Sequence, residues 1–422
     1  MKTRQLCFDI LYQIIVKKEF SNNLLNQMLI KYPDLSNQDK TLIFKIVYGT
    51  LKNKIYLEYV TNKFIDPHKT NQKLQILLWL SVYQFYFLDK IPNYAIVNEA
   101  VEIAKTINPK VSGFINATLK RILTADASVF DIINKNEIET LSIRYSFPRG
   151  LLLILKTQFG DEHALNIIKD SINIPKISLR VNTLKISREE LIAKYPQYNL
   201  QPSLITSAGV ISSYPVMNSE MFKNGEIIMQ DEMSIKVVEA LAPQPGELVL
   251  DMCAAPGGKT TYLGQLMNNQ GHVDAYEIAN YKIPLIMENI DRLGLTNIEV
   301  HNLDANLISP NQLYDRILLD APCSGFGVIK RKPEIKYKTW TSEDLFDLVS
   351  IQAQLLDKAY QLLKPQGVLV YSTCTFEIYE NQEQIKNFVQ KYPDMKIEQE
   401  EQVFGYEHNS DGFYYCRLVK TK

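Results

Sequence analysis

The chain has few of the features that mark secreted, metal-binding or membrane proteins. It has five cysteines in 422 residues, too few and too scattered for a disulfide framework. None of them forms a CxxC pair or lies near a histidine cluster, and this disfavours a zinc site. Reduced thiols in a cytosolic protein are the simplest account. We therefore expect a cytoplasmic protein that binds no metal.

Long apolar runs and a strong net charge are also missing. The longest uncharged stretch, Leu74–Leu88, contains polar residues and is short for a membrane span, so it predicts a buried helix. Asp9, Gln13 and Lys17 interrupt the apolar residues near the N-terminus, unlike a secretory signal. The formal net charge of −1 provides no global attraction to nucleic acid, so any such binding must use local patches. We expect no membrane partner.

The length predicts two or three domains. Residues 1–135 show apolar residues at helical spacing and predict an all-α domain. Residues 136–226 predict a small α/β subdomain, with an alternating strand at Ile177–Asn182. From 227 to 422 strand and helix signals alternate, which predicts an α/β domain with a doubly wound parallel sheet. Its expected strands are 247–251, 272–276, 298–301, 315–320, 367–372 and 412–419, and its expected helices are 259–268, 280–293, 343–363 and 379–391.

A turn rich in small residues follows the first of these strands. It reads Asp251-Met252-Cys253-Ala254-Ala255-Pro256-Gly257-Gly258-Lys259-Thr260 and is neither a GxGxxG fingerprint nor a Walker A loop. Small residues let backbone amides approach a ligand, and a helix is expected from about Lys259. Glu277, at the end of the next strand, is placed to bind ribose hydroxyls, and Asp304 could receive an adenine amino group. The pattern predicts a nucleotide-type cofactor site; the alternative is that these residues only make tight turns.

Two cysteines each follow an apolar, strand-like run. They lie in Asp320-Ala321-Pro322-Cys323-Ser324-Gly325 and Tyr371-Ser372-Thr373-Cys374-Thr375. In one parallel sheet both thiols would lie at its carboxyl edge, where open sheets bind ligands. If the cofactor is S-adenosylmethionine, a thiolate that adds to C6 of a pyrimidine enables C5 to attack the methyl group. Asp320 could bond the N3/N4 edge of a cytosine and the second thiol could assist elimination, but the residues do not rank the two thiols.

The other cysteines are expected to have no chemical role. Cys7 and Cys416 predict buried structural residues, and Cys253 predicts a backbone contact within the cofactor turn.

A base-modifying enzyme must reach its target atom outside the stack, so it needs single-stranded or flipped substrate. A basic segment with interleaved aromatic residues follows Cys323 and is suited to phosphate contacts and base stacking; the alternative is a solvated loop. The candidate RNA-binding residues are Lys330, Arg331, Lys332, Lys336, Lys338, Tyr337 and Trp340, with Arg180 and Asn182 as further candidates on the small subdomain.

At these motifs, and at Met229-Gln230-Asp231, residues 175–420 resemble the RNA cytosine-C5 methyltransferases. The resemblance implies a Rossmann-like catalytic domain, with Cys374 as the nucleophile and Cys323 assisting product release. DNA cytosine methyltransferases attack with the cysteine of their Pro-Cys segment, so only the resemblance ranks the thiols. The implied S-adenosylmethionine contacts are Cys253, Ala254, Ala255, Pro256, Gly257, Gly258, Lys259, Glu277, Asp304 and Asp320, with Lys282 as a loosely aligned addition.

The N-terminal domain carries a second resemblance. Ile91–Val101 and Gly113–Ala117 are similar to the helical fold of the NusB antitermination factor. The combination resembles the bacterial 16S ribosomal RNA methyltransferases of this family, which implies one cytosine in naked or early-assembling 16S rRNA as the target. We also expect a monomer. The family's His and Trp are missing from Tyr145–Gly150, and this departure bears on domain packing or RNA contact.

Two alternatives remain at this point. One is the same chemistry on another RNA, such as tRNA or 23S rRNA, and the NusB-like domain argues against it. The other is a non-catalytic RNA-binding or antitermination factor with a silent cofactor fold. The intact pair Cys323 and Cys374 argues against that, since a binding module needs neither thiol.

Overall fold

A computed structural model describes residues 3–133, 135–338 and 340–422. The chain divides into two compact units, Met1–Asn173 with Ile329–Thr339, and Ile174–Val328 with Trp340–Lys422. Within the described residues, no helix has both the length and the apolarity needed to cross a membrane.

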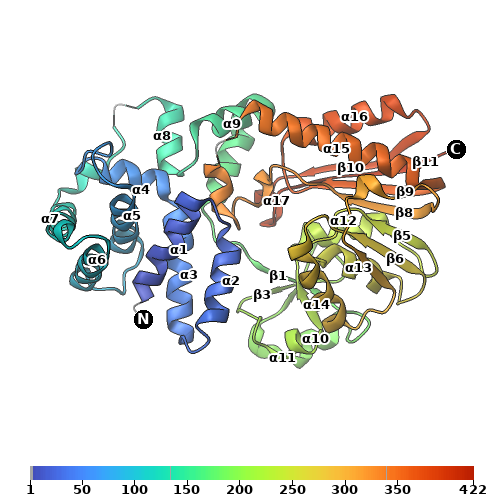
Figure 1. Cartoon of the computed structure of the whole chain (residues 1–422), viewed down its shortest axis with the longest axis horizontal. Coiled ribbons are helices and arrows are strands. Elements are labelled where there is room, and N and C mark those ends of the chain that lie inside the picture. The colour runs from blue at the N-terminus through green and yellow to red at the C-terminus, as the bar shows by residue number, and fades with distance from the viewer. Residues whose placement is uncertain (1–2, 134, 339) are drawn as a thin grey trace. The chain divides into compact units, whose positions relative to one another are not determined.

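The first unit is helical, as predicted for its N-terminal part (Figure 1). Ser36 caps α3 by accepting a hydrogen bond from the backbone N–H of Asp39. The predicted buried helix is α5. Its residues Leu77, Leu78 and Leu80 lie in the hydrophobic core of the helical unit with almost no exposed surface. The helices are α1 (Thr3–Lys17), α2 (Ser21–Lys31), α3 (Asn37–Lys52), α4 (Lys54–Thr61), α5 (Gln72–Phe87), α6 (Asn93–Ile107), α7 (Ser112–Leu123), α8 (Glu137–Arg144) and α9 (Arg149–Asp170).

The last two of these helices correct the predicted domain division. Residues 136–173 were expected in the small α/β subdomain, but α8 and α9 belong to the helical unit. The loop between them explains why. Phe147 is fully buried, and the hydroxyl of Ser146 accepts a hydrogen bond from the backbone N–H of Ile55 at 2.8 Å. The chain leaves the helical unit near residue 173 rather than 135.

A later segment, residues 329–338, returns to the helical unit. The Tyr337 hydroxyl donates to the carbonyl of Leu51 at 2.8 Å. The carboxylate of Glu334 accepts from both the backbone N–H and the hydroxyl of Ser21 at 2.9 Å. The helical unit is therefore built from two separate stretches of the chain.

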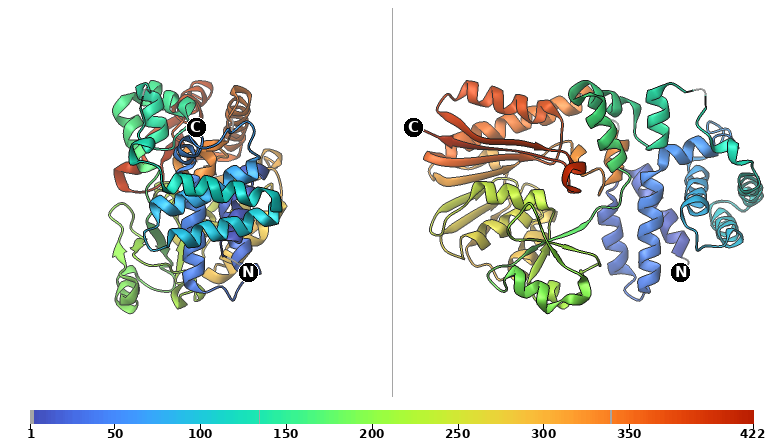
Figure 2. Two further views of the ribbon diagram at one scale, coloured as in Figure 1. Left: turned by 90° about the vertical axis from the view of Figure 1, so that its left-hand side faces the viewer. Right: turned by 180° about the vertical axis from the view of Figure 1, so that it is seen from behind.

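The second unit contains a seven-stranded sheet in the order β10-β11-β9-β8-β5-β6-β7. Its five strands from β9 to β7 are parallel, but β11 is antiparallel to β9 and β10 is antiparallel to β11. The expected parallel sheet is thus correct except at this edge, where the C-terminal strands (red in Figure 2, right) form a hairpin. The strands are β5 (Leu248–Asp251), β6 (His272–Tyr276), β7 (Ile298–His301), β8 (Tyr314–Asp320), β9 (Leu363–Thr373), β10 (Met395–Val403) and β11 (Phe413–Lys420).

Helices cover both faces of this sheet (Figure 1). Alternate strand residues divide between the faces, as Val249 packs toward α12 and α13 and Leu250 toward α15. On one face lie α12 (Glu232–Leu241), α13 (Gly258–Leu266) and α14 (Ile283–Leu293), and on the other lie α15 (Ser342–Leu362) and α16 (Gln382–Lys391). The short helix α17 (Gly405–His408) precedes β11.

A smaller, antiparallel sheet of four strands, β2-β3-β1-β4, belongs to the same unit. The alternating strand predicted at residues 177–182 is β1. The helices and strands of this part are β1 (Ile177–Val181), α10 (Arg188–Lys194), β2 (Gln201–Pro202), β3 (Gly209–Ser212), α11 (Glu220–Lys223) and β4 (Ile227–Met229).

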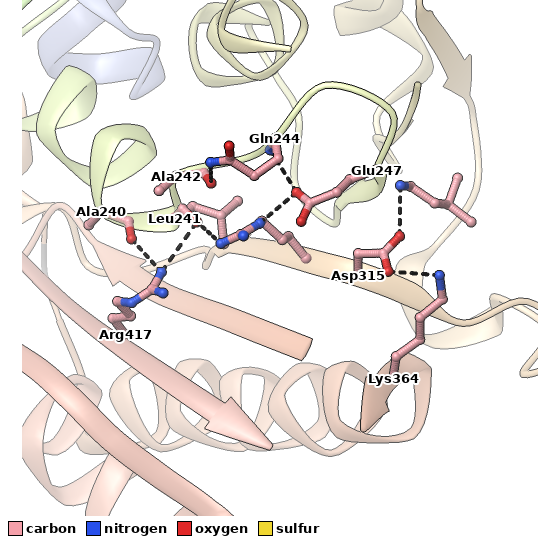
Figure 3. A network of polar contacts seen from close by, with 10 residues as sticks. Ala240, Leu241, Ala242, Gln244, Glu247, Asp315, Lys364 and Arg417 are labelled. Carbon is pink, nitrogen blue, oxygen red and sulfur yellow. Dashed lines mark hydrogen bonds and ion pairs between the residues drawn. The ribbon is translucent and has the colours of Figure 1, made fainter. Parts of the chain in front are cut away.

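Polar contacts fasten the amino edge of the large sheet (Figure 3). The Asp315 carboxylate accepts from the backbone N–H of Leu248 at 2.9 Å and pairs with Lys364 at 2.8 Å. Arg316 donates to Glu247 at 2.6 Å, which fixes the loop before β5. This edge lies at the start of the parallel strands, so the loops free to form a site are those at their carboxyl ends.

Candidate active site

The structure brings the two predicted thiols together. Strands β8 and β9 are parallel neighbours with Asp320 opposite Ser372. Cys323 and Cys374 follow these strand ends, and their sulfur atoms lie 3.4 Å apart. Both are partly exposed. A single substrate atom can therefore be within reach of either thiol.

The surroundings of the two thiols differ. The pKa of Cys323 is raised well above its ordinary value, first by its hydrogen bond to Cys374 and then by burial. A proton on Cys323 that is donated to the sulfur of Cys374 produces this effect. The charge of Cys374 also contributes to raising the pKa of Lys259, so the two groups are close enough to interact. The raised pKa keeps Cys323 in its thiol form, and Lys259 places a cation close to Cys374.

Lys259 joins the cofactor turn to the thiol strands. Its ammonium pairs with the Asp320 carboxylate at 2.7 Å. Burial disfavours the charged ammonium, but the nearby carboxylate outweighs burial and the pKa of Lys259 is raised. The other oxygen of Asp320 accepts from the hydroxyl of Ser372 at 2.7 Å. Asp320 is thus held in position as a partly exposed acceptor beside both cysteines.

The predicted cofactor turn is a tight loop between β5 and α13. Gly257 adopts a φ of 96°, in the region that favours glycine, and its N–H donates to the carbonyl of Ala254 at 2.7 Å. Asp251 accepts from the hydroxyl of Thr260 at 2.7 Å. These contacts present small residues and the amino end of α13 at the carboxyl edge, where a ligand's backbone contacts are expected.

The predicted carboxylates lie beside this turn. Glu277 is buried and accepts from the N–H groups of Ala255 at 3.3 Å and Ala279 at 2.8 Å. Lys282 pairs with Glu277 at 3.7 Å, so its cation balances this carboxylate. Asp304, after β7, accepts from the backbone N–H of Asn306 and is partly exposed. A carboxylate at the end of β6 and small residues after β5 fit an adenosine-type cofactor.

The remaining cysteines are not activated. The pKa of Cys253 is raised well above its ordinary value by burial and by the charge of Asp251. Cys7 and Cys416 are fully buried, and burial raises the pKa of each. Burial also raises the pKa of Asp251, to about 6.

Two of the predicted RNA contacts are corrected. Lys330 is 4% exposed, and its ammonium pairs with Asp170 at 2.9 Å within the helical unit. Lys336 is also buried and donates to the carbonyl of Lys52 at 3.0 Å. A lysine held in this way cannot also contact a phosphate. Arg331 and Lys332 are partly exposed and stay candidates.

Arg180 is a third corrected RNA contact. Its side chain is fully buried and donates to Gln265 at 3.2 Å and to Thr261 at 3.0 Å. It also donates to Gln230 and to the carbonyl of Gly258. Asn182, just past the end of β1, is buried and donates to two backbone carbonyls. Both residues hold the small sheet against α13 and α14, behind the cofactor turn.

One group of possible metal ligands lies on β6 and β7. His272, Asp274 and Glu299 place ligand atoms within 4.8 Å of one another. However, Asp274 already accepts from Tyr314 at 2.9 Å and bonds His301 at 2.8 Å. These contacts account for its buried carboxylate without a cation.

Sequence reasoning missed a buried carboxylate close to the thiols. Glu380 is fully buried and accepts from the backbone N–H of Ser324, the residue after Cys323, at 2.8 Å. It lies six residues beyond Cys374, in Glu377-Ile378-Tyr379-Glu380-Asn381. The available signal was an acid and an amide shortly after the strand that leads to Cys374.

Comparison with known proteins gives consistent matches along the chain. The family model described as 16S rRNA methyltransferase RsmB/F matches residues 238–419, and the NusB family model matches residues 1–124. The chain is 38% identical to the probable ribosomal RNA small subunit methyltransferase B of Bacillus subtilis, over 98% of both chains. It is 33% identical to ribosomal RNA small subunit methyltransferase B of Shewanella oneidensis, over 92% of both. The crystal structure of PH0851 is similar with a TM-score of 0.84, at 25% identity and over 99% of both chains.

Proposed function

Since the chain belongs to the RsmB/F family of 16S rRNA methyltransferases, we propose that it methylates C5 of a cytosine in 16S rRNA, with S-adenosylmethionine as the methyl donor. The observation that carries this proposal is the pair of thiols 3.4 Å apart at the carboxyl edge of the sheet. Most methyl acceptors are nucleophilic already and need no thiol, whereas carbon 5 of a pyrimidine does. The reaction would take place in the cytoplasm, with 16S rRNA as the partner.

The chain's residues fit the methyl donor as follows. The turn from Cys253 to Lys259 would contact it through backbone groups, Glu277 would bind its ribose and Asp304 its adenine. The donor supplies a methyl group on a sulfonium and leaves as the thioether. Lys282, paired with Glu277, would hold that carboxylate in position.

Cys374 is the nucleophile in this proposal. Its thiolate adds to C6 of the cytosine, which makes C5 electron-rich, and C5 then forms a bond to the methyl carbon. Asp320 would accept from the exocyclic amine of the base while Lys259 balances its charge. Loss of the C5 proton to a base then expels the thiolate of Cys374 and restores the ring. Cys323, which holds its proton beside Cys374, would assist this elimination.

RNA contact is proposed for the residues that remain accessible. Arg331 and Lys332 lie shortly after Cys323 and would bind phosphate. Lys330 and Arg180 are left out because each is buried and bonded.

The test is methyl transfer from labelled S-adenosylmethionine to unmodified 16S rRNA, with denaturing gels to detect protein–RNA adducts. Cys374→Ala is expected to abolish transfer and give no adduct. Cys323→Ala is expected to accumulate an adduct, because elimination is slowed. The opposite pattern would reverse the roles of the two thiols, and transfer only to tRNA or 23S rRNA would refute the substrate.

A further inference from the structure

A buried carboxylate links the two loops that carry the thiols. We propose that Glu380 is a positioning residue that fixes the spacing between Cys323 and Cys374. Its catalytic meaning rests on the function proposed above, but its structural effect does not.

The first set of contacts holds the Cys323 loop. One oxygen of Glu380 accepts from the backbone N–H of Ser324 at 2.8 Å, and the other accepts from the Ser324 hydroxyl. Gln352, on α15, donates both to Glu380 at 3.0 Å and to the carbonyl of Pro322 at 2.9 Å. Ser324 is therefore bonded to the carboxylate directly, and Pro322 is linked to it through Gln352.

The second set holds the Cys374 loop. The hydroxyls of Ser324 and Thr375 lie 2.8 Å apart. The residue that follows Cys323 therefore contacts the residue that follows Cys374. Asn381, next to Glu380, donates to the carbonyl of Thr375 at 3.0 Å and accepts from the Thr373 hydroxyl at 2.6 Å. The residues on both sides of Cys374 are thus held by Asn381, the neighbour of Glu380.

The cost of burying this carboxylate argues for a specific role. Burial raises the pKa of Glu380, although hydrogen bonds from Ser324 and Gln352 oppose the rise. A buried acid is unfavourable unless its oxygens are bonded, and here all the bonds lead to the thiol loops and α15. Removing it would leave the Ser324 N–H without its acceptor and would release both loops.

The test compares Glu380→Ala and Glu380→Gln with a matched control, Glu226→Ala. Glutamine keeps an oxygen for the two N–H donors and can offer its amide N–H to the Ser324 hydroxyl. Glu226 is likewise a buried carboxylate, bonded to Lys194 and Tyr195 on the small subdomain, far along the chain from either thiol. Thermal unfolding of all variants measures how much stability is lost when a buried carboxylate is removed at either position.

The main measurement is the rate of disulfide formation between Cys323 and Cys374. Diamide is the oxidant: it takes up two electrons and two protons while the two thiols form one disulfide, and peptide mass mapping identifies the bond. This rate reports the spacing of the thiols without requiring any methyl transfer. The second measurement is kcat for 16S rRNA beside the Kd for S-adenosylmethionine.

Glu380→Ala is expected to slow disulfide formation and lower kcat, each by about 10–100-fold, because displacements near 1 Å have effects of this size. The Kd for S-adenosylmethionine should stay within about 2-fold, and Glu380→Gln should recover most of both rates. Wild-type disulfide rates in Glu380→Ala, or slowing equal to that of Glu226→Ala, would overturn the proposal. If the wild type methylates no RNA, the proposed function fails, and the disulfide rates still decide the role of Glu380.

Discussion

Replacing Arg180 by methionine should destabilise the second unit rather than weaken RNA binding. The guanidinium donates four hydrogen bonds from a fully buried position, to Gln265, Thr261, Gln230 and the carbonyl of Gly258. Methionine fills the volume of the stem but removes the donor to the side-chain oxygens of Gln265 and Gln230, while the Gly258 carbonyl keeps its bond from Thr261. Breaking a buried, charged hydrogen-bond set typically costs about 3–5 kcal/mol.

The assay is thermal unfolding followed by circular dichroism. For a unit of this size, about 4 kcal/mol corresponds to a fall in Tm of about 8–16 °C. The control is Lys332→Ala on the partly exposed basic segment, which should leave Tm within about 2 °C and weaken binding to 16S rRNA. A methionine variant with the wild-type Tm and a weakened affinity for RNA would refute the reasoning and restore Arg180 as an RNA contact.

Three further results are expected. Lys259→Met should slow the alkylation of Cys374 by iodoacetamide at pH 7 by about 3–10-fold, because the ammonium no longer stabilises a thiolate; peptide mass mapping measures the rate. Asp251 has a folded pKa raised by burial to about 6, above its ordinary 3.8, so the folded protein binds more protons than the unfolded chain between these values. Stability should therefore fall as pH rises through this window, by about 3 kcal/mol, and Asp251→Asn should remove that fall in urea unfolding at pH 4 and pH 7. Gly327→Ala would place a methyl group 2.0 Å from a carbonyl oxygen, so it should cost about 3 kcal/mol in the same assay. Gly113→Ala in α7 meets nothing within 4 Å and should stabilise by about 0.5–1 kcal/mol; equal effects of the two alanines would contradict this.

The central parallel strands could be predicted because most of their residues are buried between two layers of helices. Strands β5 and β8 each differ by one residue from their predicted bounds, since buried strands contain continuous apolar runs. Strands β6 and β7 match their predicted residues although polar residues interrupt both. Strand β10 was missed. It lies at the sheet edge, and most of Met395–Val403 is charged, polar and exposed, so no apolar pattern marks it.

The residues of the candidate site also divide into those that the sequence could predict and those that it could not. The thiol pair followed from the rule that parallel strands end at one edge, so spacing along the sequence was enough. Arg180 could not be placed, because an arginine on an alternating strand gives no sign of whether a helix covers it. Lys330 is paired with Asp170 and Glu380 is bonded to Ser324, each distant in sequence, so a local pattern could mark these residues as candidates but could not show their partners.

The two-stretch construction of the helical unit bears on how the protein is synthesised. Tyr337 and Glu334 complete contacts with Leu51 and Ser21, yet they are translated after most of the second unit. A nascent chain released at residue 173 would lack these partners and leave part of its helical surface uncovered. The contacts that this segment makes with the N-terminal helices can therefore form only after residues 174–328 have been translated, although the apolar core of those helices uses none of its residues.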